Sequence, residues 1–363
     1  MGIPSSLTDD YGVLLTTTLR AMQPKIRDNI SRSNKVLGYL EMKGQFRKQD
    51  GGERIKIPLM HALNTTADIY QGYGTLNTLP QDGFTSAFFD WTQLSASISI
   101  SRKEERQNSG ASKAIDLLKS KTMQAENSLK ELVNNCIVAG RITASANLGQ
   151  FFQRRGTLDT SALGPMPLPA LIDANPARSV SIGNINGNTY PFWRNQATSS
   201  TATTFAGYKG ELNGVYNDCT KGSMGNPDLI LSDQRAHEIY WNSLQSQERY
   251  YVTDSQTIDV LGGDAPIKFR GAAWIWDEVM PDVETTAEVV DAIGTVTASS
   301  VMFMNSQSME FITDTQTDFI TTPMVRPANQ DARVGQILWM GALGVNNRRK
   351  NGVLYGVLRT IAA

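Results

Sequence analysis

The sequence has few of the residues that most metal and redox sites require. Two cysteines and two histidines occur among its 363 residues, namely Cys136, Cys219, His61 and His237. We expect these four residues to build no zinc site, no iron–sulfur cluster and no disulfide framework within one chain. The sequence therefore predicts a protein without a metal site and without a cofactor.

An excess of charge of either sign is also lacking. Lysine and arginine total 34 against 35 acidic residues, which gives a formal net charge of −1, and charged residues make up only 19% of the chain. Proteins that bind nucleic acid through bulk charge carry a clear excess of lysine and arginine, so this class is excluded. No signal peptide opens the chain, and no apolar run approaches the roughly 20 residues of a membrane-spanning helix. We expect a protein that is made and kept in a cytoplasm, with no membrane partner.

Motifs of the common enzyme classes are missing as well. The sequence contains no G-x-x-x-x-G-K-[ST] phosphate loop, no H-E-x-x-H and no G-x-S-x-G elbow. A hydrolase or transferase would have to use Asp233, His237 or Glu104. Asp233 is better explained as a helix cap and His237 as part of an exposed helix face. We expect no catalytic residue, and an enzyme remains the alternative from another class.

The length of the chain predicts about two domains, at roughly 150 residues each. The clearest element is a helix from Ser112 to about residue 139, roughly 40 Å long at about 1.5 Å per residue. Apolar and small residues recur in it at intervals of three and four, which places them on one face. They are Ile115, Leu118, Thr122, Ala125, Leu129, Leu132 and Cys136. We interpret Cys136 as a small core residue and Glu126 with Lys130 as an ion pair on the helix surface.

A long aromatic excursion separates two candidate strands. Arg54–Leu59 and Leu94–Ser101 alternate polar and apolar residues, which predicts an antiparallel ribbon. An excursion as long as residues 60–93 is unusual unless it has a function, and its aromatics suit docking on another molecule. The alternative is that it folds back onto its own domain. The candidate contact residues are Tyr70, Tyr73, Phe84, Phe88, Phe89 and Trp91.

Charges are segregated along the chain. Residues 20–48 contain eight basic and two acidic residues, a local charge of +6, whereas residues 271–325 contain nine acidic residues and no basic one. The basic segment is either a solvated helical arm or a surface that faces a polyanion or an acidic neighbour.

The remaining sequence predicts mixed structure. Residues 142–225 read as loops and short strands, and a strand at 227–231 leads into a helix that ends near residue 245. Further strands are predicted at 267–269, 273–276, 301–304, 311–312, 337–340 and 353–358. The basic run from Asn346 to Gly352 is typical of a hairpin turn.

The order of these parts resembles that of tailed-phage major capsid proteins of the Hong Kong 97 type. The local stretches that carry the resemblance are 190–196, 226–232, 269–271, 276–281, 301–305 and 342–355. The resemblance implies an α+β, Hong Kong 97-like capsid fold. Its parts are an N-terminal arm (1–45), an extended β-hairpin E-loop (46–106), a P-domain with a spine helix and a loop-rich insert (107–225), an α/β A-domain (226–300) and returning strands (301–363).

The resemblance also implies a structural function. Such subunits self-assemble into hexamers and pentamers of an icosahedral head that encloses double-stranded DNA without sequence specificity. The implied partners are further copies of the chain, the DNA and a portal. Assembly would use either a separate scaffolding protein or none, and the shell would be stabilised either by packing or by a separate decoration protein. The implied location is the virion, after assembly in the host cytoplasm. The nearest alternative is a cellular encapsulin-like nanocompartment of the same fold, which would enclose a cargo enzyme.

Contacts in such a shell follow from the same resemblance. The six aromatic residues of the excursion are expected to lie on a neighbouring subunit. The basic residues Arg20, Lys25, Arg27, Lys113, Lys119 and Lys121 are expected to face DNA or the acidic stretch of the next subunit. In the family's type member a loop lysine is joined covalently to a neighbour's asparagine, but residues 60–93 contain no lysine. We therefore expect no such cross-link, and no fused scaffolding domain before the arm.

Overall fold

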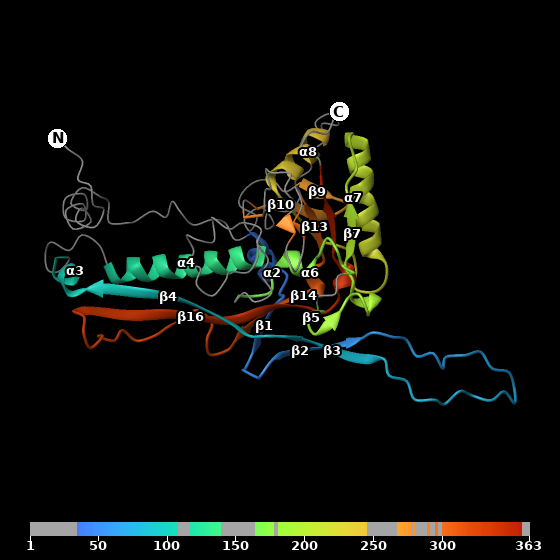
Figure 1. The fold of residues 1–363 in the computed structure, drawn as a ribbon, viewed down its shortest axis with the longest axis horizontal. Helices are drawn as coiled ribbons and strands as arrows, with labels where there is room; N and C mark the ends of the chain where they lie inside the picture. The colour runs from blue at the N-terminus through green and yellow to red at the C-terminus, as the bar shows by residue number, and fades with distance from the viewer. Residues whose placement is uncertain are drawn as a thin grey trace. The chain divides into compact units, whose positions relative to one another are not determined.

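A computed structural model describes residues 35–107, 117–138, 164–177, 181–244, 267–277, 279–280, 289–290, 295–296 and 300–357 (Figure 1). Helices and strands are mixed, so the predicted α+β class is confirmed. The described residues belong to two compact units. The first unit includes residues 93–132 and 316–339, and the second includes 35–92, 133–315 and 340–357. Residues 1–34 of the predicted arm (1–45) lie outside the described residues, and its remainder contains a helix, Lys35–Met42, with Val36, Tyr39 and Leu40 buried.

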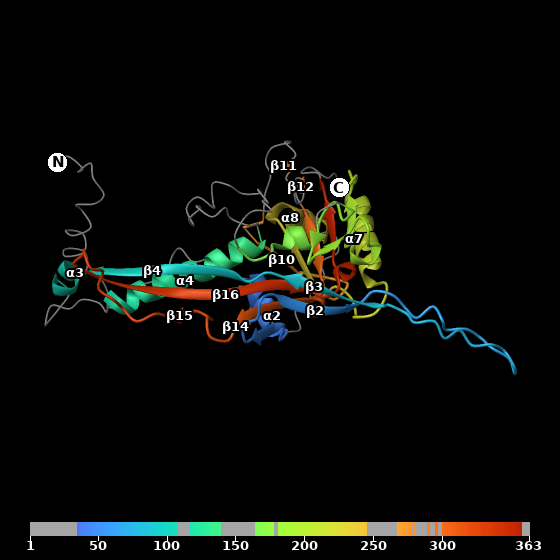
Figure 2. The same ribbon diagram turned by 60° about the horizontal axis from the view of Figure 1, so that its bottom comes forward.

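The first unit is a helix packed on a long, narrow sheet. It contains α3 (Arg102–Gln107), β15 (Ile320–Thr321), nearly all of β4 (Thr92–Ser101) and the first parts of α4 (Leu117–Val138) and β16 (Ala332–Val345), which both end in the second unit. Strands β4 and β15 both pair with β16. Helix α4 runs beside β4 in both views, and the Lys121 Nζ donates to the carbonyl oxygen of Ser99 at 3.0 Å (Figures 1 and 2). The buried side chains between helix and sheet include Ile98, Ile100, Ala125, Leu129, Ile337 and Trp339.

Helix α4 confirms the long helix predicted from spacing. Ala125, Leu129 and Cys136 on the predicted face are buried, so Cys136 is a core residue as predicted. The Lys130 Nζ lies 2.7 Å from Glu126 Oε1, which confirms the predicted ion pair. The proposed cap at Ser112 lies outside the described residues.

The second unit is built around a six-stranded sheet with the order β7-β17-β13-β8-β10-β9. The strands are β7 (Gln196–Ser199), β8 (Leu229–Ser232), β9 (Ile267–Phe269), β10 (Ala272–Trp276), β13 (Val301–Met304) and β17 (Gly352–Tyr355). Every residue of β8 and of β13 is buried. Interior strands covered on both faces read as continuous apolar runs, which is why the sequence predicts these strands correctly.

Helices α7 (Phe205–Thr220) and α8 (Gln234–Leu244) pack on one shared hydrophobic core with this sheet. Helix α7 corrects the prediction of loops and short strands for residues 142–225. Glycine and asparagine lower its helix propensity, but tertiary packing overrides propensity. A helical spacing is present in its buried residues, Tyr208, Leu212, Val215 and Cys219. The Thr204 side chain caps the helix by accepting a hydrogen bond from the Gly207 amide at 3.2 Å.

A further group of strands completes the second unit. Strand β14 (Met309–Asp314) pairs antiparallel with the end of β16 and parallel with β1 (Phe46–Gln49). The remaining elements are α2 (Lys35–Met42), α6 (Leu168–Leu171), β5 (Ser181–Ile182), β6 (Ile185–Asn186), η2 (Pro191–Trp193), β11 (Val289–Val290), β12 (Thr295–Val296), η4 (Ser306–Ser308) and η5 (Arg348–Lys350). Arg47 of β1 forms an ion pair with Glu310 of β14 at 3.0 Å, so one residue of the acidic stretch is neutralised within its own chain.

The two strands of the predicted ribbon do not pair with each other. Strand β2 (Ile55–Met60) pairs antiparallel with β3 (Phe84–Phe89), not with β4, which pairs with β16. The reason is the alternation of burial in β2, whose inward side chains meet Ala87 and Phe89 across the pair. The excursion is therefore a hairpin with a loop of residues 61–83 at its end.

The prediction of a hairpin turn at residues 346–352 is also wrong. Strand β16 ends in one sheet and β17 begins in the other, with η5 between them. Arg348 and Lys350 of this segment are buried rather than solvated. The basic run, which in sequence resembles a surface turn, is therefore a buried connection between the two sheets.

Candidate assembly interface

The loop of residues 61–83 projects beyond the β2–β3 hairpin and away from the rest of the second unit (Figures 1 and 2). Its base is closed by a hydrogen bond from the His61 amide to the Gly83 carbonyl at 2.9 Å. Further along, Thr65 Oγ1 donates to Gln81 Oε1 at 2.6 Å. Among the described residues, the hydrogen bonds of 62–82 stay within the loop. No other described segment covers it.

Apolar side chains of this loop face solvent. Ile69 is 94% exposed and Tyr73 is fully exposed, and Leu63, Tyr70, Leu76 and Leu79 are exposed too. The charged residues of the loop are Asp68 and Asp82, and it contains no lysine or arginine. A contiguous exposed apolar surface marks an interaction site. The loop therefore presents an apolar, weakly acidic surface that a partner would cover.

The structure divides the six predicted aromatic contact residues. Tyr70, Tyr73 and Phe84 are exposed, and Phe88 and Trp91 are half-buried. The Trp91 Nε1 donates to the carbonyl oxygen of Gly52 at 2.8 Å, which ties this ring to its own chain. Phe89 is only 3% exposed, and its ring packs against Gly183 and Gly344. The prediction that Phe89 contacts another subunit is wrong because the residue faces the core of its own unit.

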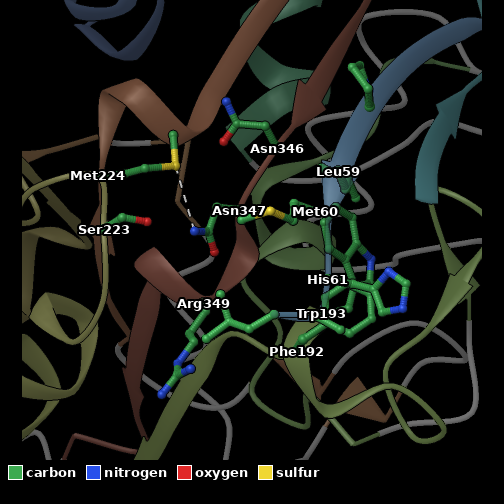
Figure 3. Close-up of a pocket in the computed structure, with 13 residues that line it drawn as sticks. Leu59, Met60, His61, Phe192, Trp193, Ser223, Met224, Asn346, Asn347 and Arg349 are labelled. Carbon is green, nitrogen blue, oxygen red and sulfur yellow. Dashed lines mark hydrogen bonds between the residues drawn. The ribbon is translucent and has the colours of Figure 1, made fainter. Parts of the chain in front are cut away.

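A cavity of about 560 Å³ lies at the base of the loop. The end of β2 and the residues that follow it form one wall, through Leu59, Met60 and His61. The other lining residues in view are Phe192, Trp193, Ser223, Met224, Asn346, Asn347 and Arg349 (Figure 3). Ser223 and Met224 lie on one side, and the rings of His61, Phe192 and Trp193 lie on the other (Figure 3). The volume lies within the roughly 300–1,000 Å³ that is common for ligand pockets.

The charged lining of this cavity favours an anion. No aspartate or glutamate is among its lining residues. Arg349 is exposed, and no hydrogen bond or ion pair joins its guanidinium to any residue that the structure describes. The His61 Nδ1, which donates when it carries the proton, is buried without a hydrogen-bond partner in the described part of the chain. The Asn346 Oδ1 is buried without a partner there too, but it can only accept, so it suits a neutral donor of the bound group and not the anion itself. The cavity can therefore accept an apolar group that carries a negative charge at its edge.

Two buried cations fix the segment that forms one side of the cavity. Arg348 donates hydrogen bonds to the carbonyl oxygens of Ala170, Leu171 and Trp193 and to Asn195 Oδ1, at 2.8–3.3 Å. Burial lowers the pKa of Arg348 to about 10, against the opposing effect of the nearby Asp173 carboxylate. The Lys350 Nζ donates to three carbonyl oxygens, those of Thr220, Gly222 and Gly225, and burial lowers its pKa. Sequence reasoning missed both roles.

The predicted basic residues are only partly placed. Arg20, Lys25, Arg27 and Lys113 lie outside the described residues. Lys119 is exposed on α4. Lys121 instead forms an ion pair with Glu104 at 2.9 Å, within its own unit.

Glu104 has a structural role. Its Oε2 accepts from the Ser101 amide, and its own amide donates to Ser101 Oγ, both at 3.2 Å. This reciprocal pair is a capping box at the start of α3. Partial burial alone would raise the pKa of Glu104, but the hydrogen bonds from Lys121 and Ser101 and the Lys121 charge outweigh it and lower that pKa.

The other two residues proposed for an enzyme, Asp233 and His237, lie at the start of α8 in the second unit. Asp233 is buried at the start of α8, where burial first and the Asp233 charge second raise the pKa of Tyr208. His237 is half-buried, with its ring edge-on to Trp274 at 6.3 Å, which corrects the prediction of an exposed face. Among the described residues, no cluster of three or more metal-ligating side chains occurs. No described helix is long and apolar enough to cross a membrane.

Comparisons with known proteins identify the fold. No protein-family model and no curated protein matches the sequence. Among solved structures, the cyanophage A-1(L) capsid subunit matches with a TM-score of 0.63 and 13% identity, over 97% of this chain and 99% of that one. An encapsulin of Synechococcus elongatus matches with a TM-score of 0.58 and 10% identity, over 99% and 98%. The capsid of Myoviridae phage XM1 matches with a TM-score of 0.51 and 12% identity, over 93% and 96%.

Proposed function

From the Hong Kong 97-like capsid fold of this chain, we propose that it is the major capsid protein of a tailed bacteriophage. The observation that carries the proposal is the likeness to a cyanophage capsid subunit over nearly the full length of both chains. An active site would need accessible reactive groups, but the candidates Asp233 and Glu104 serve the core and a helix cap. The function is structural: the chain builds a shell.

The first partner of the chain is a further copy of itself. The exposed apolar side chains of residues 61–83 find no cover among the described residues, and a neighbouring subunit supplies it. A contact between the loop of one copy and a different surface of the next is head-to-tail, and such contacts close into rings. These rings are the hexamers and pentamers of an icosahedral head.

The shell encloses double-stranded DNA without reading its sequence. Lys119 is the described basic residue that supports this part of the proposal, and Arg20, Lys25, Arg27 and Lys113 are further candidates. Contacts of lysine and arginine with phosphates are salt-dependent and carry no base recognition. Replacing Lys119 by glutamate then lowers the DNA content of the shells and leaves them closed. A failure of closure would instead assign Lys119 to a contact with an acidic neighbour.

Other partners follow from the same function. A portal admits the DNA, and separate scaffolding and decoration proteins guide and strengthen the shell, which is assembled in the host cytoplasm and becomes part of the virion. Because residues 60–93 contain no lysine, shells boiled in detergent release single chains. A ladder of covalent oligomers would contradict this expectation.

An encapsulin-like nanocompartment is the second candidate, favoured by the likeness to the Synechococcus elongatus encapsulin over almost the whole of both chains. Electron microscopy of the protein purified from an expressing host and from infected cells separates the candidates. Closed shells that fill with DNA during infection support the capsid. Shells that retain a cargo protein support the nanocompartment, and small soluble oligomers contradict both.

A further inference from the structure

We propose that the cavity at the base of the β2–β3 hairpin receives residues 68–70 from the loop of a second copy of this chain. This inference rests on the proposed function, because it names the surface on which the projecting loop of a neighbouring subunit lies. In this contact Ile69 and Tyr70 enter the apolar part of the cavity, and the Asp68 carboxylate pairs with the Arg349 guanidinium.

The charges of the two surfaces are complementary. The cavity has an exposed arginine and no acidic lining residue, whereas the loop has aspartates and no basic residue. Like-charge contacts are costly, so complementary surfaces select their partner and its register. A basic or neutral peptide would leave the Arg349 charge uncompensated. The loop of a second copy of this chain supplies the negative charge that matches Arg349.

The apolar parts match as well. Ile69 and Tyr70 follow Asp68 directly and are 94% and 62% exposed. The cavity offers them the Met60, Phe192 and Met224 side chains, and its volume of about 560 Å³ accommodates side chains of this size. Aromatic anchors that fill a pocket supply most of the binding free energy in protein interfaces. Asp82, the other aspartate of the loop, is followed by Gly83 at the base and therefore has no exposed apolar pair directly after it.

The position of the cavity allows the same contact to repeat from one copy to the next. The loop begins at the wall of the cavity, at His61, and its end projects away from it (Figure 1). The same loop therefore cannot fill its own cavity while it projects. A loop that reaches the cavity of the next copy repeats the same contact around a ring. The hydrogen bonds of Arg348 and Lys350 hold the backbone at Arg349 in place before assembly, so only the Arg349 side chain has to become ordered in the contact.

A charge swap tests this contact in full-length protein. Arg349→Asp alone and Asp68→Arg alone are each expected to lower the yield of shells about tenfold, because each places like charges together. The double variant with both changes restores assembly. The matched control combines Arg349→Asp with Asp82→Arg, which changes the same charge elsewhere in the loop and restores nothing. Shell yield is measured by sedimentation, and the unfolding midpoint of each variant checks that it folds.

The outcomes separate the inference from the proposed function. Wild-type protein that forms no shells in infected cells, where its assembly partners are present, overturns both. Wild-type shells together with normal assembly of Arg349→Asp overturn the inference and leave the proposed function intact. A loss of assembly that Asp68→Arg does not rescue assigns the cavity to another occupant, such as a decoration protein, and also overturns it.

A cysteine pair provides a second readout that does not depend on charge. The native cysteines Cys136 and Cys219 are buried, so a new exposed pair reacts selectively. Ile69→Cys with Ser223→Cys should give a ladder of disulfide-linked chains after mild oxidation of assembled shells, and reduction should remove it. Either single variant serves as the control and gives no ladder. A double variant that assembles but forms only monomers on a non-reducing gel would overturn the inference.

Discussion

The loop of residues 61–83 and the helix-covered sheet of the second unit both contain many apolar and aromatic side chains, but they place them oppositely. Tyr208 of the covering helix α7 and Trp274 and Phe303 of the sheet are almost completely buried, whereas Ile69 and Tyr73 in the loop face solvent. Burial of apolar surface is the main stabilising contribution to folding, so the sheet stabilises the subunit itself. The loop adds nothing comparable to the isolated subunit, and its apolar surface is available for assembly.

The same contrast occurs within three consecutive basic residues. Arg348 and Lys350 point into the second unit and bind carbonyl oxygens, and Arg349 between them is exposed at the cavity. Two of these cations therefore belong to the fold and one to the proposed interface. The following substitutions test this division between folding and assembly.

The largest effect on folding is expected at Arg348. Replacing it by alanine leaves the carbonyl oxygens of Ala170, Leu171 and Trp193 buried and unpaired, and should lower the free energy of unfolding by about 3–5 kcal/mol, since each unsatisfied acceptor costs about 1–3 kcal/mol. The matched control is Arg349→Ala, which should change it by less than about 0.5 kcal/mol because Arg349 is exposed. Urea unfolding of dissociated subunits measures both. Equal effects would remove the distinction between the two arginines.

One leucine from each region gives a matched pair. Leu212 of α7 is fully buried and Leu76 of the loop is 60% exposed. Leu212→Ala creates a cavity and should lower the free energy of unfolding by about 2–4 kcal/mol. Leu76→Ala should leave that quantity nearly unchanged and reduce the yield of shells. Calorimetry of the subunit measures the stability, and sedimentation measures the yield of shells. A larger loss of stability in Leu76→Ala than in Leu212→Ala would contradict the assignment.

A smaller effect is expected at the cap of α7. Thr204→Ala removes the acceptor for the Gly207 amide and should cost about 1 kcal/mol of stability. The neighbouring Thr203→Ala makes the same chemical change at an exposed residue and should cost less than half of that. Equal thermal midpoints for the two variants would show that the cap contributes nothing.

The smallest effect is the pH dependence that Glu104 contributes in the first unit. Its pKa in the folded subunit is lower than the usual value of 4.5. The folded state therefore favours the ionised carboxylate above that usual value, and this stabilisation is lost as the pH falls through the folded pKa. Because the Glu104–Lys121 pair is partly exposed, the contribution is only about 0.5 kcal/mol.

The corresponding measurement compares wild type and Glu104→Gln at several pH values. The two unfolding free energies should differ near pH 7 and converge below the usual carboxyl pKa. Lys121→Met should shrink the difference near pH 7, because it removes the cation that lowers the pKa. A difference that grows on acidification would contradict the assigned sign.

The sequence predicts those elements whose own pattern matches their environment. The buried strands β8 and β13 and the helix α4 follow from apolar runs and helical spacing. The pattern fails where the partner is distant in sequence, because alternation predicts a strand but not which strand pairs with it. Alternation therefore predicts the wrong partner for strand β2. Helix α7 is not predicted, because tertiary packing outweighs the low helix propensity of its glycines and asparagines.

The candidate site is predicted less completely. The aromatic excursion indicates a docking loop, and Tyr70 and Tyr73 are exposed as such a function requires. The cavity brings together residues near positions 60, 192, 224 and 347, and no local pattern joins segments so far apart. The burial of Arg348 and Lys350 is not predicted for the same reason, because the carbonyl groups that surround these two residues come from segments distant in the sequence.

Replacement of the loop tests the central claim most directly. Residues 62–82 are exchanged for a two-residue Asn-Gly turn, which closes an antiparallel hairpin. Sedimentation velocity and the unfolding midpoint are then measured on the same preparation. The account predicts a folded subunit with an unchanged midpoint that forms no shells under conditions in which the wild type assembles. Shells formed as readily as by the wild type would contradict it.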